Sequence, residues 1–170
     1  SGVVFVTGFS RSFVLPNSDN IQPGAGSESA FILIFENDGT FRKSRFLGGN
    51  STDEGLALTT FEEDVFITGR TSSVNFPVAG IGLATVNNGG DDVFLTVLND
   101  TAGIIWSQYY GGSTGDRANA ITIDNQNNIL IAGETESIDL PILLGNQITK
   151  DGNSDDGFIA KFTPLGLRIY

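Results

Sequence analysis

Short apolar runs separated by polar turns dominate the pattern of this chain. In its middle part, four runs rich in Val, Ile, Phe and Thr are each bounded by Gly, Asn, Asp or Ser. Such runs are typical of β-strands, and no window keeps the 3.6-residue period of a long helix. The pattern therefore predicts four strands, at residues 55–61, 65–70, 93–98 and 104–110.

The same landmarks occur three times along the chain. The motif Val4-Phe5-Val6-Thr7-Gly8 returns in similar form at residues 65–69 and 129–133, and a proline follows each copy at the same distance. A fixed period of this length is the signature of a repeat architecture. The prolines are Pro16, Pro77 and Pro141.

Further landmarks follow each proline in a constant order. A strand-like run comes first, and then a turn glycine. After the first two prolines, another β run follows that ends in a Gly-Gly pair, and an acidic residue follows this pair. The strand-like runs are residues 30–35, 93–98 and 157–162, the turn glycines are Gly39, Gly103 and Gly166, and the acidic residues are Asp53 and Asp116. The period of about 61 to 64 residues divides the chain into repeats at approximately residues 1–47, 48–110 and 111–170.

Four short antiparallel strands per repeat, joined by Gly-rich turns, describe a β-propeller blade. We therefore predict an all-β fold in which residues 1–170 form one propeller segment of about three four-stranded blades. The first blade lacks its opening strand, so the eleven strand signals run three, four and four. Because closed propellers have about four to eight blades, three interpretations remain open. The chain is a fragment of a longer propeller, a subunit that completes a ring with its own copies, or an element of an open filament.

Two of the repeats resemble a known family. The motifs lie in the third and second repeats. The first repeat resembles the family less closely, because its residues 26–31 keep the aromatic residue of the motif but lack its Asp pair. The motifs are residues 111–124, 127–137, 140–141 and 156–162, with residues 68–73, 76–77 and 89–94 in the second repeat. These residues are similar to the SBBP repeat, a β-propeller repeat of bacterial secreted and surface proteins. The resemblance implies an extracellular or cell-surface propeller and contributes no catalytic motif.

Composition narrows the range of functions. The chain contains no Cys, His or Met, which excludes disulfides, Cys/His zinc sites and His- or Cys-based catalytic triads within it. The net charge of −11 argues against nucleic acid as a partner, and no apolar run approaches the length of a membrane span. No carboxylate stands in an apolar setting that would favour glycoside hydrolysis. We therefore expect a protein that is not an enzyme.

Acidic residues gather where the long loops meet the blade-to-blade turns. In a propeller, the connections at residues 10–29, 71–91 and 135–155 open on the same end as these turns. Calcium binds six to eight oxygens, many of them from carboxylates, so a calcium site is one hypothesis and a role in turns and solubility is the other. The candidate ligands are Asp53, Asp116, Asp91, Asp92, Asp155 and Asp156.

Three aromatic residues and two N-glycosylation sequons are the remaining candidates for a functional role. Trp106, Tyr109 and Tyr110 could stack on sugars, but Phe fills comparable places one repeat earlier, so we interpret them as packing residues. Asn50 and Asn99 each begin a pattern that fits N-glycosylation.

The favoured function is a scaffold that mediates assembly or protein interaction through its terminal strand edges, with itself or with neighbouring blades as the partner. The alternative is a module that binds a glycan or a surface protein with its long acidic loops, assisted by calcium.

Overall fold

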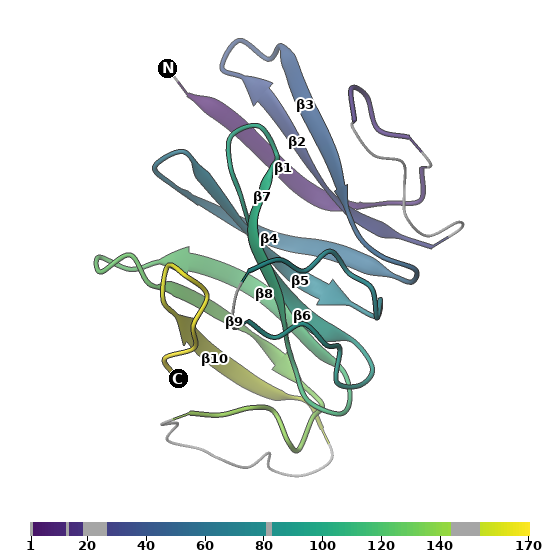
Figure 1. The fold of residues 1–170 in the computed structure, drawn as a ribbon, viewed down its shortest axis with the longest axis vertical. Coiled ribbons are helices and arrows are strands. Elements are labelled where there is room, and N and C mark those ends of the chain that lie inside the picture. The colour runs from purple at the N-terminus through teal and green to yellow at the C-terminus, as the bar shows by residue number, and fades with distance from the viewer. Residues whose placement is uncertain (1, 13, 19–26, 81–82, 144–153) are drawn as a thin grey trace.

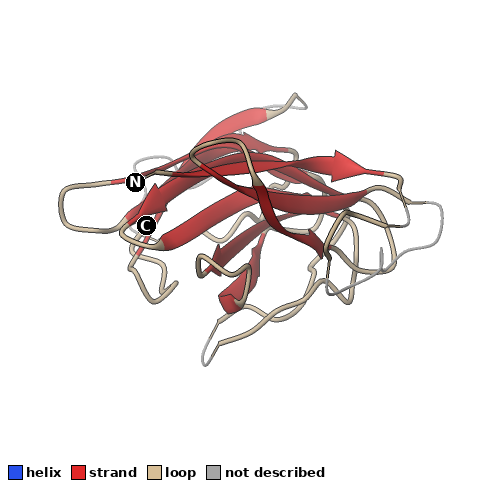
Figure 2. Cartoon of the chain, turned by 90° about the horizontal axis from the view of Figure 1, so that it is seen from above, coloured by secondary structure: helices blue, strands red, loops and turns tan. Residues whose placement is uncertain are grey.

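The computed structural model describes residues 2–12, 14–18, 27–80, 83–143 and 154–170. Within these ranges the chain forms three antiparallel β-sheets, which follow one another along the long axis of the molecule (Figure 1). Figure 2 shows the same part of the chain as strands and loops, without a helix. Accordingly, these residues contain no helix of the length and apolarity that crossing a membrane requires. The predicted all-β class is confirmed.

Each sheet is built from strands that are consecutive in the chain. The first sheet contains β1 (Val3–Ser10), β2 (Ser29–Glu36) and β3 (Phe41–Leu47). The second contains β4 (Asp53–Phe61), β5 (Asp64–Thr71), β6 (Asp92–Leu98) and β7 (Ile104–Tyr110). The third contains β8 (Asp116–Ile123), β9 (Ile129–Thr135) and β10 (Asp156–Phe162). These meandering sheets match propeller blades, and the first sheet lacks the opening strand that β4 and β8 supply to the other two.

The last sheet differs from the prediction at its outer edge, where a fourth strand was expected. Only four residues follow Gly166 in the sequence, and they run beside β10 without forming a regular ladder. Ile169 N donates to Lys161 O at 2.7 Å, and Lys161 N donates to Tyr170 O at 2.9 Å. The described residues therefore form ten strands rather than the eleven that the pattern predicts.

The hairpin turns lie where their polar composition predicts them, with one local difference. Gly39 and Gly166 adopt positive φ angles of 84° and 81°. In the second sheet, however, the left-handed residue is Ala102, with φ 62°, and not the neighbouring Gly103. The Asn99 side chain explains this difference because its Oδ1 accepts hydrogen bonds from Thr101 N at 3.0 Å and Gly103 N at 2.8 Å. Such an Asx turn fixes the backbone without requiring glycine at the left-handed position.

Two apolar cores hold the sheets together. One joins the first sheet to the second, where Ile32 and Ile34 of β2 pack with Val65 and Ile67 of β5. The other joins the second sheet to the third, where Val93, Leu95 and Val97 of β6 pack with Ile129 and Ile131 of β9. The second sheet thus buries both of its faces, and the first and third sheets each bury one face against it, as neighbouring blades of a propeller do.

The aromatic residues of β7 belong to these cores. Tyr109 is 1% exposed, and its hydroxyl donates to Ser73 O at 2.8 Å and accepts from Phe76 N at 2.9 Å. Trp106 Nε1 donates to Pro164 O at 3.1 Å, and Tyr110 Oη donates to Pro141 O at the same distance. Since all three rings are buried, they pack between sheets and satisfy their polar atoms internally. They do not form an exposed stacking platform.

Candidate functional site

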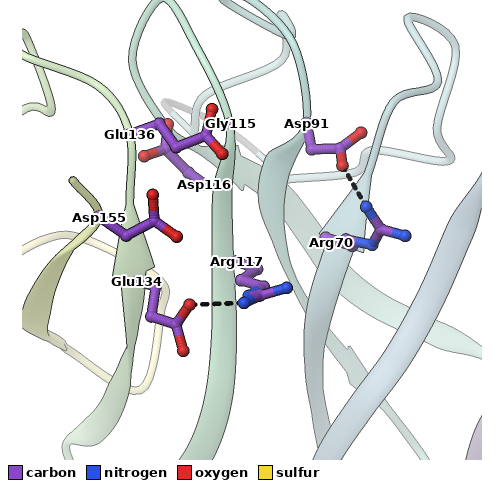
Figure 3. A pocket seen from close by; sticks show the side chains of 8 residues that line it. All are labelled: Arg70, Asp91, Gly115, Asp116, Arg117, Glu134, Glu136 and Asp155. Carbon is purple, nitrogen blue, oxygen red and sulfur yellow. Dashed lines mark hydrogen bonds and ion pairs between the residues drawn. The ribbon is translucent and has the colours of Figure 1, made fainter. Parts of the chain in front are cut away.

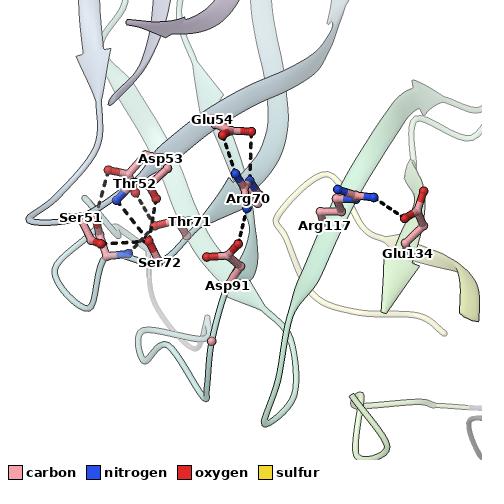
Figure 4. A network of polar contacts seen from close by, with 12 residues as sticks. Ser51, Thr52, Asp53, Glu54, Arg70, Thr71, Ser72, Asp91, Arg117 and Glu134 are labelled. Atoms are coloured by element: carbon pink, nitrogen blue, oxygen red, sulfur yellow. Dashed lines mark hydrogen bonds and ion pairs between the residues drawn. The ribbon is translucent and has the colours of Figure 1, made fainter. Parts of the chain in front are cut away.

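Asp53 anchors the turn between the first and second sheets. Its Oδ2 accepts hydrogen bonds from Gly49 N at 2.8 Å and Ser73 Oγ at 3.0 Å. Its Oδ1 accepts one from Thr71 Oγ1 (Figure 4). The residue is fully buried, and this burial raises the pKa of the Asp53 carboxyl to about 6. The carboxylate therefore ties the blade-to-blade turn to the end of β5.

Asp116 repeats this arrangement between the second and third sheets. Its Oδ2 accepts from Gly112 N at 2.7 Å and from Ser137 Oγ at 2.8 Å. The other carboxylate oxygen, Oδ1, is buried without a hydrogen-bond partner. The hydroxyl that would correspond to Thr71 belongs to Thr135, and it donates instead to Ser137 O at 3.4 Å. We call each of these two turns, with its anchoring Asp, a corner. The two corners share the bonds that Oδ2 accepts, but Oδ1 is bonded in Asp53 and has no partner in Asp116.

A second buried carboxylate, that of Asp92, lies beside Asp116. Asp92 Oδ2 accepts from Asn88 N at 2.9 Å, while Oδ1 has no partner. A side-chain carbon added at Gly111 would lie 2.3 Å from Asp92 Oδ1 and 2.9 Å from Asp116 Oδ2, so both groups converge on this glycine. Burial, and then the charge of Asp116, raise the pKa of the Asp92 carboxyl to about 7. Ser29 occupies the corresponding place at the first corner, beside Gly48 and Asp53.

A shallow polar pocket of about 90 Å³ opens next to this corner. Figure 3 shows its two arginines from neighbouring sheets, each paired with a carboxylate. Arg70 contacts Asp91 and Glu54 at 2.5 Å each, and Arg117 contacts Glu134 at 2.5 Å. The full lining is Arg70, Asp91, Gly115, Asp116, Arg117, Glu134, Glu136 and Asp155.

The six acidic residues predicted as calcium ligands fall into separate places. Asp91, Asp116 and Asp155 line the pocket, and Asp92 lies behind it at Gly111. Asp53 belongs to the corner one sheet earlier, and Asp156 begins β10. Among the residues that the structure describes, no three acidic side chains are grouped to hold a metal ion. The calcium hypothesis stays a prediction, and the observed contacts of Asp53 and Asp116 are those of turn anchors.

Sequence reasoning missed the hydroxyl groups that receive these anchors. Thr71 and Ser73 follow the motif glycine of β5 by two and four residues, and Thr135 and Ser137 follow that of β9 in the same way. The spacing repeats in the sequence and could have been found, but a hydroxyl two residues from a strand end has no distinctive meaning until its carboxylate partner is known.

The long loops and the sequons are only partly described. Residues 13, 19–26, 81–82 and 144–153 of the loops lie outside the described residues, so the loop-binding hypothesis stays a prediction there. Asn50 is exposed, whereas Asn99 is partly buried and uses its Oδ1 within its own turn.

Comparison with known proteins identifies the repeat. No curated protein matches the chain. The family described as SBBP, beta-propeller repeat, matches residues 105–141, which run from β7 through the Gly-Gly turn and β8 to the residues after β9. This segment contains the Asp116 anchor and the Ser137 hydroxyl that binds it. The chain therefore carries an SBBP β-propeller repeat, as its sequence motifs predict.

Proposed function

We propose that this chain is a non-catalytic, extracellular or cell-surface scaffold that assembles with further β-propeller sheets. The observation that carries the proposal is the outward face of the first sheet. Val4 and Val6 of β1 occupy the motif positions at which the other two sheets bury Val65, Ile67, Ile129 and Ile131. Those four side chains are at most 1% exposed, whereas Val4 is 48% exposed and Val6 is 40% exposed.

The exposed valines continue into an apolar band on the same face. Val4 lies opposite Phe35 in the β1–β2 register, and Val6 lies opposite Leu33. Phe35 also packs edge-to-face on Phe41 of β3, with ring centroids 5.4 Å apart. In the second and third sheets, the face at these positions packs against the preceding sheet. Burial of a contiguous apolar face favours association, so the partner that fits best is another sheet of this type.

The contacts of the buried acids support a scaffold over an enzyme. Asp53 and Asp116 each accept a backbone N–H from a Gly-Gly turn and a serine hydroxyl. Arg70 and Arg117 are engaged with Glu54, Asp91 and Glu134. The Asp contacts fix the turns that lead from one sheet to the next, and the ion pairs join strands within a sheet. Both are roles that a scaffold needs.

Light scattering over a range of protein concentrations tests the proposal. We expect the wild-type chain to form a defined oligomer or a filament, and V6D to remain a monomer because a buried unpaired carboxylate is costly. V74D is the matched control, since Val74 is 70% exposed and lies in the loop after β5. A wild-type chain that stays monomeric and folded at every concentration would contradict self-assembly.

The second candidate function is a binding module for a glycan or a surface protein. The polar pocket beside Asp116 favours it, because five carboxylates and two arginines line one opening. Calcium titration by calorimetry, followed by a glycan array with and without calcium, tests this candidate. Saturable binding that Glu136→Gln weakens would support it, and an absence of binding in both measurements would reject it.

A further inference from the structure

Three carboxylates meet at one end of the third sheet. Asp116 begins β8, Glu136 directly follows β9, and Asp155 directly precedes β10. In the strand register, Asp116 and Asp156 both lie opposite Thr135 of β9, one on each side. The register thus brings these strand ends together, and Asp116, Glu136 and Asp155 line the same polar pocket (Figure 3).

The second sheet provides an internal comparison, because its charges are balanced at the same positions. Arg70 donates to Asp91 at 2.5 Å and also bonds to Glu54. Thr71 donates to Asp53 Oδ1. By register and by distance from the motif glycine, the counterparts of Asp116, Glu136 and Asp155 are Asp53, Ser72 and Asp91. Both carboxylates among these counterparts therefore have a side-chain donor.

The third sheet lacks the cation that Arg70 supplies to the second. Its residue at the position of Arg70 is Glu134, which adds a further carboxylate to the pocket. Arg117 donates to Glu134 at 2.5 Å, and this bond raises the pKa of Arg117 more than the charge of Asp155 does. The carboxylates of Asp155 and Glu136 form no hydrogen bond or ion pair with any other described residue. Both side chains are exposed and therefore open to a cation from outside.

The buried oxygen of Asp116 is a second and independent sign that a donor belongs in this pocket. Asp116 is only 1% exposed, and its Oδ1 has no hydrogen-bond partner. The same oxygen of Asp53 is bonded to Thr71, whereas Thr135 donates to a backbone oxygen instead. Because a buried acceptor without a donor costs free energy, the pocket favours a ligand that combines positive charge with hydrogen-bond donors.

We propose that this pocket binds a guanidinium group, which takes the place that Arg70 has in the second sheet. A guanidinium presents several N–H donors in a planar fork, so it can bond to separate carboxylates at once. A metal ion would need its ligands gathered around one point, and the described acidic side chains are not grouped in that way. The inference rests on the binding-module candidate, whose partner chemistry it names, and it is independent of assembly.

An NMR titration of the whole chain with N-acetyl-arginine methylamide tests the inference. We expect saturable shifts of the amides of Gly115, Glu136 and Asp155. The citrulline analogue, which keeps the shape but not the charge, should cause none, and the lysine analogue should bind at least about threefold more weakly. D155N and E136Q should each weaken binding about threefold to tenfold. Agmatine distinguishes the two sources of the group, because tighter binding of agmatine indicates a free small molecule and tighter binding of the capped arginine indicates a peptide.

A charge swap within the third sheet is the sharpest variant. R117E combined with E134R copies the Glu54–Arg70 pair and keeps the net charge. The introduced guanidinium should bond to Asp155, as Arg70 bonds to Asp91, and should abolish saturable binding. Circular dichroism checks that the swapped chain folds. D38N is the control, since Asp38 is exposed in a hairpin turn of the first sheet and its loss should leave the affinity unchanged.

Three results would overturn the inference. The first is an absence of saturable shifts with the capped arginine, the second is equal binding of the citrulline or lysine analogue, and the third is binding that neither D155N nor the charge swap changes. The inference and the binding-module candidate can fail separately. Saturable calcium or glycan binding at these amides, without binding of the capped arginine, would keep the binding module and remove the guanidinium site.

Discussion

At the residue scale, the buried carboxyls of Asp92 and Asp53 make the stability of the fold depend on pH. Burial raises the pKa of Asp92 to about 7 and that of Asp53 to about 6, whereas an unfolded Asp titrates near pH 3.9. The folded chain therefore binds these protons more tightly than the unfolded chain does. The resulting stabilisation is complete below the unfolded pKa and is lost as the pH rises through the folded values.

We predict that the free energy of unfolding falls between about pH 4 and about pH 7, measured by urea denaturation. D92N should be more stable than the wild type at about pH 8, by about 1–3 kcal/mol, and nearly equal to it at about pH 4. The amide keeps an acceptor for Asn88 N and removes the buried charge.

The control for this prediction is D38N. Asp38 is exposed, and hydrogen bonds from Thr40 lower the pKa of its carboxyl, so removing its charge should give no gain at about pH 8. A D92N variant that is less stable than the wild type at both pH values would mean that the carboxylate is stabilised where it lies.

At the element scale, the stability of a sheet depends on a glycine wherever its opening strand approaches the next strand closely, as β4 approaches β5 at Gly69. G69A should lower the free energy of unfolding by about 3 kcal/mol or more, since the new methyl group would clash with the Glu54 carbonyl, which cannot move without breaking the sheet. G8A is the matched control in the dilute chain, because the ring of Phe31 can shift, and its cost should stay within about 1 kcal/mol. Equal losses in chemical denaturation would contradict the comparison.

Much of this element structure follows from the sequence. The predicted strands at residues 55–61, 65–70, 93–98 and 104–110 match β4 to β7 within a few residues, because alternation and turn residues are local signals. The fourth strand that the pattern predicts for the last sheet is not formed, because the residues after Gly166 run beside β10 without a regular ladder. The sequence does not indicate that Ala102, rather than Gly103, is the left-handed residue of the turn in the second sheet, because this depends on the side chain of Asn99.

The candidate site was less predictable. Asp53 and Asp116 can be recognised in the sequence because they recur at matching positions of the repeat. Their recurrence does not reveal which hydroxyl groups bind them. The convergence of Asp92 with Asp116 on Gly111 joins residues of different sheets. A contact of this kind depends on how two sheets pack, and no local pattern records it.

At the scale of the whole molecule, charge and apolar area act against each other. The net charge of −11 repels other copies, and salt screens this repulsion, while the Val4 and Val6 face favours contact. We therefore predict that raising the salt concentration shifts the chain toward its assembled state in sedimentation velocity. V6D should show no such shift. Dissociation of the assembly by salt would mean that ion pairs, rather than the apolar face, hold it together.

The most direct test of the account is hydrogen–deuterium exchange of β1, β5 and β9 in the monomer and in the assembled state. We predict that β5 and β9 are protected in both states, because each is paired on both sides, and that β1, the edge strand of the first sheet, becomes protected only on assembly. Protection of β1 in the dilute monomer, or rapid exchange of β1 within the assembly, would contradict the proposal that assembly covers the first sheet.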